Sequence, residues 1–284
     1  MSRQSSACVV AIVVAAVMLA AATPAEAQRD FEPLFDKYTL RLEGSAIGTS
    51  TEIRLDSEML GQGTTINFED DLALDGSDLI PSLTFEWQIA RRHKLGVRWQ
   101  DISRDSSAHA EREIRWGDEI IPIDADIQLG FDVTQYFVDY AYFPWVKERW
   151  AAGFGLGVRV VELSSTLAWQ SESTQGEGST DAEGTGPLPY LYFEYRRLLS
   201  DHWRFRGGLG WLAVEIEDID GSQYVARADI EYLMGRHWGF GASLNYAVID
   251  VDWAGLENEA GEAVYTGAIE IDVNDVSLFV RLRF

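Results

Sequence analysis

The sequence predicts an all-β protein, a single antiparallel barrel whose strands run up and down in chain order. Period-two alternation of apolar and polar residues is strong along most of the chain, whereas helical periodicity is weak throughout. The connections between apolar runs alternate between tight turns and mostly long polar loops. Aromatic residues are abundant, with 10 Trp, 11 Tyr and 13 Phe, and many lie at the ends of the runs. These observations favour an up-and-down barrel over a helical or mixed fold.

The first 27 residues are predicted to be a signal peptide that is cleaved. Arg3 supplies the positive region, residues 9–22 form a short apolar core, and "PAEA" ends in the small-x-small pattern of a cleavage site. The single cysteine, Cys8, would leave with this peptide, so the mature chain has no thiol chemistry. Residues 28–36 are then a short periplasmic segment, and residues 37–284 form the barrel domain.

The stretch 238–248 illustrates the strand pattern. Trp238, Phe240 and Leu244 fall on one face, and Gly239 and Ser243 fall on the other. Four tight turns, at 91–93, 146–148, 200–202 and 235–237, together with the two chain ends imply five hairpins and hence ten strands. Eight is the alternative, if the hairpin near 79–100 does not form. The stretch 103–126 reads as that hairpin continuing outward, with its turn at "WGDE". The same alternation recurs at 38–45, 83–89, 95–100, 135–142, 150–160, 190–196, 203–211, 226–234 and 276–284.

One face of these strands is too apolar for water, while the other carries full charges. A soluble sandwich is the alternative, because it buries its apolar face and leaves the charged face wet. The apolar runs last ~9–11 residues, which is the length a tilted strand needs to cross a bilayer. We therefore predict a transmembrane β-barrel, and no stretch after residue 27 is long and apolar enough for a membrane helix. The predicted aromatic girdle at the membrane interface comprises Trp87, Trp150, Trp203, Trp238 and Phe284.

The ending "DVSLFVRLRF" resembles the C-terminal signal strand of Gram-negative outer-membrane β-barrels. Phe284 matches the terminal aromatic position, and Leu282, Val280 and Leu278 match the alternate apolar positions. The resemblance implies a small monomeric barrel with short periplasmic turns and long external loops. It also implies Sec-type export to the outer membrane of a Gram-negative bacterium, with the barrel-assembly machinery as a partner during biogenesis.

Inside the barrel, residues of opposite charge occur in similar numbers. An unpaired buried charge is very costly, so we expect these residues to pair as a structural network. Small barrels are filled by side chains, which predicts a filled polar lumen and not an open pore. The predicted network comprises Arg41, Glu43, Glu86, Arg98, Asp139, Arg159, Glu194, Arg196, Arg204, Arg206, Arg227, Asp229, Glu231, Arg281 and Arg283.

Further along several strands, the polarity of the two faces is exchanged. After residue 248, Ile249 and Val251 continue the inward face, and Asp250 and Asp252 point outward. We infer that the barrel extends beyond the membrane on the external side, with an apolar interior there. That interior is either a packed core or a pocket for an acyl chain or hydrophobic solute. The possible mouth pocket comprises Phe131, Val133, Val161, Val214, Ile216, Ile249, Val251, Trp253, Ile269, Ile271 and Val273.

The external segments are strongly acidic. Residues 57–78, 101–126, 169–186, 215–220 and 250–272 hold 29 of the 46 acidic residues and three of the 23 basic ones. With a net charge of −23, the surface would repel nucleic acid. The expected partners are outer-membrane lipid and lipopolysaccharide, with divalent cations bridging carboxylates to phosphates.

No constellation of catalytic residues emerges from the sequence. His93, His202 and His237 fall in periplasmic turns, and external His109 has no serine in a His-x-Ser context. The Asp-x-His pair of an omptin-like protease is missing too. The acidic stretch 68–78, with Asp70, Asp71, Asp75 and Asp78, lacks the ordered spacing of a calcium loop. We expect no cofactor or metal, and predict a non-enzymatic barrel with a structural or surface-interaction role. Binding or transport of small hydrophobic molecules at the external mouth is the alternative.

Overall fold

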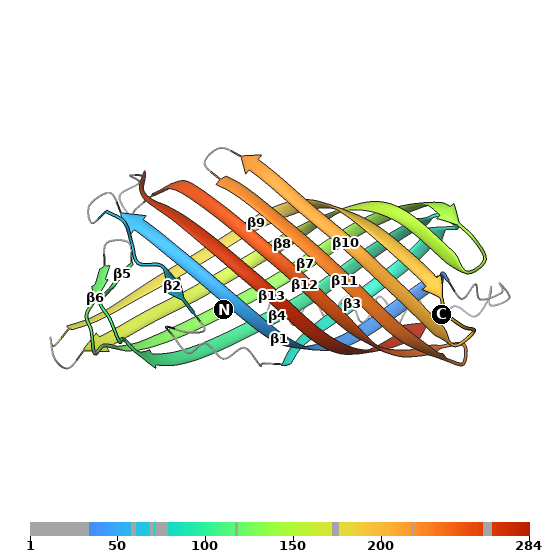
Figure 1. Cartoon of the computed structure of the whole chain (residues 1–284), viewed down its shortest axis with the longest axis horizontal. Coiled ribbons are helices and arrows are strands. Elements are labelled where there is room, and N and C mark those ends of the chain that lie inside the picture. Colours follow the sequence, from blue (N-terminus) through green and yellow to red (C-terminus); the bar gives the residue numbers. More distant parts are fainter. Residues whose placement is uncertain are drawn as a thin grey trace.

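Ten long strands form one closed antiparallel barrel (Figure 1). The computed structural model describes residues 34–57, 61–68, 71, 79–116, 119–171, 176–216, 219–257 and 263–284. Pairing of Thr39–Arg283 through Ser57–Tyr265 joins the first strand to the last and closes the barrel. The prediction of ten strands is confirmed, and the alternative of eight is wrong. The strands are β1 (Tyr38–Ser57), β3 (Leu79–Ala90), β4 (His93–His109), β7 (Asp126–Val146), β8 (Trp150–Ser171), β9 (Gly176–Leu198), β10 (Trp203–Ile216), β11 (Ile219–Met234), β12 (Trp238–Glu257) and β13 (Ala263–Arg283).

The two ends of the barrel differ in their connections. At the turn end, β3–β4, β7–β8, β9–β10 and β11–β12 are joined by the predicted tight turns. The other end, here called the loop end, carries two long connections, β1–β3 and β4–β7, and the three short ones between β8 and β9, β10 and β11, and β12 and β13. It also carries β2 (Ile66–Asn67), paired with β1, and a separate hairpin of β5 (Ile114–Trp116) and β6 (Glu119–Ile121). Trp116 pairs with Glu119, so the turn falls at the predicted "WGDE", but the hairpin is a sheet of its own and does not continue β4 and β7.

Side chains alternate between an apolar outer face and a polar lumen, as the period of two requires. On the outer face Leu42 is 61 % exposed and Leu278 is 72 % exposed. In the lumen Arg41, Arg204 and Arg281 are almost fully buried. Among the residues that the structure describes, no helix is long and apolar enough to cross a membrane.

The barrel wall is interrupted between β9 and β10. Their ladder runs only from Leu198–Arg204 to Leu191–Trp211, although β9 continues to Gly176 alongside β8. Pro187 and Pro189 lie in this continuing part, and proline lacks the N–H that a central strand needs. Beyond this point the β8–β9 hairpin and the β10–β11 hairpin diverge (Figure 1). The wall is therefore unpaired here along the half nearer the loop end.

The predicted girdle residues lie near the turn end, at or close to the ends of their strands. Trp150, Trp203 and Trp238 are the first residues of their strands, and Phe284 directly follows β13. Their rings contact other aromatic rings, for example Trp203 with Tyr232 at 5.2 Å between centroids. Trp87 and Phe284 both contact the Tyr38 ring, at 6.2 and 5.7 Å. Their place at a membrane interface stays a prediction, and the predicted signal peptide lies outside the described residues.

Candidate functional site

Residues 34–36, which precede β1 and are here called the plug, lie inside the turn end of the barrel. Leu34 and Phe35 are 4 % and 7 % exposed and pack together inside it. Residues 34–36 of the predicted periplasmic segment therefore lie within the barrel end. Their apolar neighbours come from β7, β8 and β9 and are Ala141, Phe143, Ala151 and Leu198.

Above this plug lie three groups of buried ion pairs, which together are here called the floor. In the first group, the partners come from both ends of the chain. Arg204 contacts Asp36 at 2.9 Å and Glu231 at 2.8 Å. Arg283 contacts the other oxygen of Asp36 at 3.2 Å, and Arg281 contacts Glu231 at 3.2 Å. These residues come from the N-terminal segment, β10, β11 and β13, so one group of charges joins parts of the chain that are far apart in sequence.

A second group of ion pairs lies around Glu86 and Glu194. Arg206 donates to both oxygens of Glu86, at 2.9 and 3.1 Å. Lys94 bridges the two carboxylates, at 3.2 Å from Glu86 and 2.6 Å from Glu194. Arg196 completes the group at 2.6 Å from Glu194.

The third group is a ring of four charges from β1 and β11. Arg41 contacts Glu43 at 2.6 Å and Asp229 at 2.7 Å. Arg227 contacts the same two carboxylates, at 3.0 and 2.8 Å. Each charge thus has two partners of opposite sign, which is what a buried charge needs to be tolerated.

The predicted network is therefore largely formed, with three exceptions. Arg98, Asp139 and Arg159 face the lumen but make no ion pair within 4.0 Å in the described part of the chain. The expectation of pairing is wrong for these three. Two floor residues were absent from the prediction. Lys94 shares the strand face of Arg98 and was therefore identifiable, whereas no pattern indicated Asp36. The members that do pair are Arg41, Glu43, Glu86, Glu194, Arg196, Arg204, Arg206, Arg227, Asp229, Glu231, Arg281 and Arg283.

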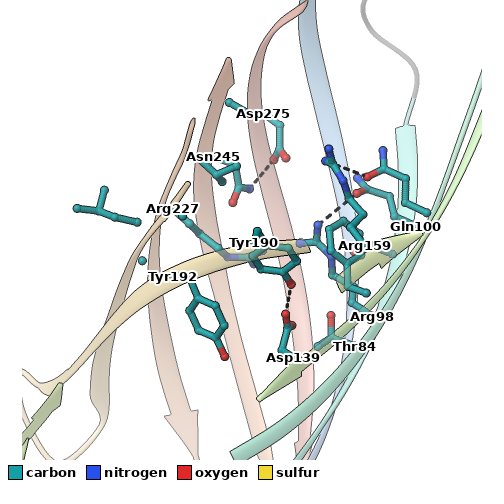
Figure 2. Close-up of a pocket in the computed structure, with 18 of the residues that line it drawn as sticks. Thr84, Arg98, Gln100, Asp139, Arg159, Tyr190, Tyr192, Arg227, Asn245 and Asp275 are labelled. Atoms are coloured by element: carbon teal, nitrogen blue, oxygen red, sulfur yellow. Dashed lines mark hydrogen bonds between the residues drawn. The ribbon is translucent and has the colours of Figure 1, made fainter. Parts of the chain in front are cut away.

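Directly above the floor the lumen is hollow. A cavity of about 310 Å³, here called the chamber, lies between the floor and more apolar residues nearer the loop end. Figure 2 shows its polar side chains, which reach inward from strands all round the barrel. The apolar part of the lining includes Ile47, Ile102, Leu212, Ile249 and Val273.

Arg98 of β4 and Arg159 of β8 are held in the chamber by neutral groups. Arg159 donates to Gln223 at 2.7 Å and to Gln135 at 3.5 Å. Arg98 donates to Gln100 at 3.5 Å. Both guanidinium groups lie near the ring of Phe137, at 4.0 Å for Arg98 and 5.9 Å for Arg159.

Two of the carboxylates that line the chamber, Asp139 and Asp275, are likewise engaged by neutral donors. Asp139 accepts a hydrogen bond from the hydroxyl of Tyr190, and Asp275 accepts one from Asn245 at 2.9 Å (Figure 2). Ser277 also donates to Asp275, at 3.1 Å. Besides the ion-paired residues of its lining, the chamber thus holds two cations and two carboxylates that make no ion pair within 4.0 Å among the described residues.

The space beside inward-facing glycines is filled by aromatic rings at some positions and is open at others. At Gly155 and Gly157 of β8 the rings of Tyr192 and Tyr190 occupy the space that a side chain would take. At Gly241 of β12 the ring of Phe279 does so. At Gly208 and Gly210 of β10, by contrast, an added Cβ would meet no atom closer than 3.6 Å. β10 therefore presents a bare wall to the chamber, which both glycines line.

An apolar cluster, here called the cap, lies at the loop end. Ile66 and Phe68 come from the β1–β3 connection, and Ile114 and Ile121 come from the β5–β6 hairpin. They pack against Ile127 and other inward residues of β1 and β7 and are at most 3 % exposed. The short hairpin thus packs against inward residues of β1 and β7 at the loop end.

The residues predicted to line a mouth pocket fall into different places. Phe131 and Ile269 pack against the cap, and Val133 is buried. Ile249 and Val273 line the chamber. Val161, Val251 and Ile271 are half-buried, whereas the side chains of Val214, Ile216 and Trp253 lie outside the described residues. The prediction of a single mouth pocket stays open.

On the exposed surface of the loop end, His109 contacts two carboxylates. Its Nδ1 lies 2.9 Å from Asp126 and its Nε2 lies 3.6 Å from Asp124. The hydrogen bond with Asp126 and the nearby negative charges raise the pKa of His109 above its ordinary value of 6.5. Asp71 pairs with Arg112 at 2.8 Å, and Asp70, Asp75 and Asp78 lie outside the described residues. Within the described ranges no group of three potential metal ligands occurs.

Comparisons with known proteins identify the fold. No family model and no curated protein matches the sequence. Among solved structures, the outer membrane protease OmpT from Escherichia coli matches with a TM-score of 0.57 at 10 % identity, over 91 % of this chain and 99 % of that one. The translocator domain of the autotransporter NalP from Neisseria meningitidis matches with a TM-score of 0.43 at 11 % identity, over 98 % of each chain. The Pseudomonas putida toluene transporter TodX matches with a TM-score of 0.39 at 8 % identity, over 88 % and 91 %. The likeness to OmpT and the closed antiparallel topology show that the chain has the outer-membrane β-barrel fold, and at this identity the likeness concerns the fold alone.

Proposed function

We propose that the protein is an integral outer-membrane barrel with a closed lumen and a structural or surface-interaction role, without enzymatic activity. In the membrane, the turn end would face the periplasm and the loop end would face the cell exterior. The loop end carries the acidic segments, which suit contact with lipopolysaccharide through divalent cations.

The observation that carries this proposal is the combination of an apolar outer face with barriers at both ends of the lumen. Leu156, Leu209 and Leu244 are each more than half exposed, and a continuous belt of such residues suits lipid. Inside, the N-terminal plug and the floor obstruct the turn end, and the cap obstructs the loop end. At the surface of the loop end, the two ring nitrogens of His109 face carboxylates.

Electrical recording tests the closed lumen. Purified protein inserted into planar bilayers should give no stable conductance steps of nanosiemens size. Steps of that size would overturn the proposal of a closed lumen. Fractionation of the source cells should place the protein in the outer membrane, and recovery in the soluble periplasm would overturn the membrane assignment.

A second function, binding of small hydrophobic molecules inside the barrel, is supported by the chamber. Ile249 and Val273, two residues predicted to face an apolar pocket, line a cavity of about 310 Å³. This volume lies at the lower end of the roughly 300–1,000 Å³ typical of ligand pockets. Isothermal titration calorimetry of the full barrel in lipid nanodiscs with small para-substituted aromatic compounds tests it, with empty nanodiscs as the blank. Absence of saturable binding for neutral and charged members alike would overturn this second function.

A further inference from the structure

We propose that the chamber binds a small organic anion, a monocarboxylate with a compact apolar body, whose carboxylate is held by Arg98 and Arg159. This inference rests on the second proposed function, ligand binding inside the barrel, and names the class of ligand. It is argued from the partners of the two arginines, from the neighbouring carboxylates and from the shape of the cavity.

The two arginines form a cationic pair whose partners are all neutral. Both guanidinium groups gather at one aromatic ring, that of Phe137, and their hydrogen bonds go to glutamine side chains. Arg159 is only 8 % exposed, so its charge is largely removed from bulk solvent. Two like charges inside the barrel repel one another, and an anion between them would turn this repulsion into attraction.

Pairing is the rule elsewhere in the same lumen. The floor arginines each contact at least one carboxylate within 4.0 Å, and several contact two. Three of these paired arginines, Arg41, Arg206 and Arg227, line the cavity as well. Arg98 and Arg159 line it without an ion pair in the described part of the chain, and an unpaired buried charge in a cavity is a candidate for ligand recognition.

Two carboxylates that line the chamber without an ion pair, Asp139 and Asp275, limit the charge of the ligand. Asp139 is held by Tyr190 and Asp275 by Asn245 and Ser277, so neither is available to neutralise the arginines by contact. Both would repel a second negative charge on a ligand in the same cavity. A singly charged carboxylate therefore fits better than a phosphate or a dicarboxylate.

The remaining lining indicates the rest of the ligand. Toward the loop end, the chamber is bounded by Ile47, Ile102, Ile249 and Val273, so a ligand held at the arginines would direct its body against aliphatic side chains. The bare wall at Gly208 and Gly210 supplies the width for a ring or a short branched chain. The unpaired part of the wall between β9 and β10 starts beside the chamber, at Tyr190 and Leu212.

Calorimetry on the full barrel in lipid nanodiscs tests the inference with three probes. These are 4-methylbenzoate, its uncharged isostere 4-methylbenzamide, and inorganic phosphate. We expect 4-methylbenzoate to bind about tenfold or more tightly than the amide, because a charge-assisted hydrogen bond is lost with the charge. Phosphate, which has no apolar body, should bind at least tenfold more weakly than the benzoate.

Matched variants locate the site. Arg98→Gln and Arg159→Gln should each weaken 4-methylbenzoate about tenfold and leave the amide nearly unchanged, whereas Arg236→Gln, in an exposed turn, should change neither. Gly210→Leu should abolish binding of both aromatic probes by filling the chamber while both arginines remain. Gly48→Leu, which places the same side chain on the outer face of β1, is its control. Heat-modified mobility on gels should confirm that each variant is folded.

The outcomes separate this inference from the function on which it rests. Equal binding of acid and amide, or no effect of either arginine variant, overturns the anion site but leaves ligand binding in the barrel standing. Tighter binding of phosphate than of the benzoate overturns the monocarboxylate class. Absence of binding by all probes overturns both proposals.

Discussion

The floor and the chamber are neighbouring levels of one lumen, built from the same strands, yet they treat charge in opposite ways. At the floor, Arg204 is enclosed by Asp36 and Glu231. One level higher, Arg159 has only glutamine partners and a cavity beside it. Paired charges and close packing are what stability requires. The chamber lacks both close packing and paired partners for Arg159, which is what a ligand-binding level of the lumen would show.

The largest effect is expected from removing one arginine at each level. Arg204→Met leaves two buried carboxylates short of a partner and should lower the free energy of unfolding by about 3–5 kcal/mol. Arg159→Met leaves no carboxylate unpaired and should lower it by about 1 kcal/mol or less, or raise it. Urea unfolding in phospholipid vesicles, followed by tryptophan fluorescence, measures both. Equal losses would erase the contrast between floor and chamber.

A second comparison sets the packed cap against the apolar chamber lining. Ile127 is 1 % exposed in the cap, and Ile127→Ala should cost about 2–5 kcal/mol of unfolding free energy because it leaves a cavity in a packed cluster. Ile249→Ala removes the same atoms from a side chain that borders open volume and should cost less than half as much. Urea unfolding followed by tryptophan fluorescence measures the loss of unfolding free energy in both variants. A loss at Ile249 as large as that at Ile127 would mean that the chamber is packed in solution.

The glycines give a smaller effect of opposite sign at two sites. Gly157→Ala would force its Cβ against Asp139 and the Tyr190 ring, at a cost of about 1–3 kcal/mol. Gly210→Ala meets nothing closer than 3.7 Å and should be neutral or stabilising by about 0.5–1 kcal/mol, because alanine loses less backbone entropy on folding. If Gly210→Ala were the more damaging change, the wall of β10 would not be bare.

The smallest effect concerns an ion pair in water, outside the lumen. The pKa of His109 should lie above 6.5 in an NMR titration and should fall toward 6.5 in Asp126→Asn. Because the folded-state pKa is raised, its contribution to stability is fully present below pH 6.5 and is lost as the pH rises through the raised pKa. Salt should reduce the shift, since both partners are exposed. A pKa of His109 unchanged by Asp126→Asn would show that the contact does not persist in solution.

The strand pattern allowed much of this architecture to be predicted, because a period of two assigns each residue to a face independently of its partners. The outward position of Trp238 and the inward positions of Arg98 and Arg159 follow from that rule alone. Pairing does not follow from it. Whether an inward arginine meets a carboxylate depends on the register across the whole barrel, as with Arg41 and Asp229, which are 188 positions apart. The cap was missed for a related reason, since Ile114 and Ile121 lie in a short hairpin whose packing position no local periodicity reports.

The plug at the turn end has a consequence for the order of folding. Asp36 precedes the first strand, yet its carboxylate is bound by Arg204 and Arg283, which are 168 and 247 positions away. Contacts between such distant positions form slowly and late, because the intervening chain must first be arranged. The charge of Asp36 is satisfied in full only once β13 has reached β1. The segment before β1 is therefore fixed in the barrel only when the last strand arrives, and a barrel that lacks β13 would leave Asp36 without one of its two arginine partners.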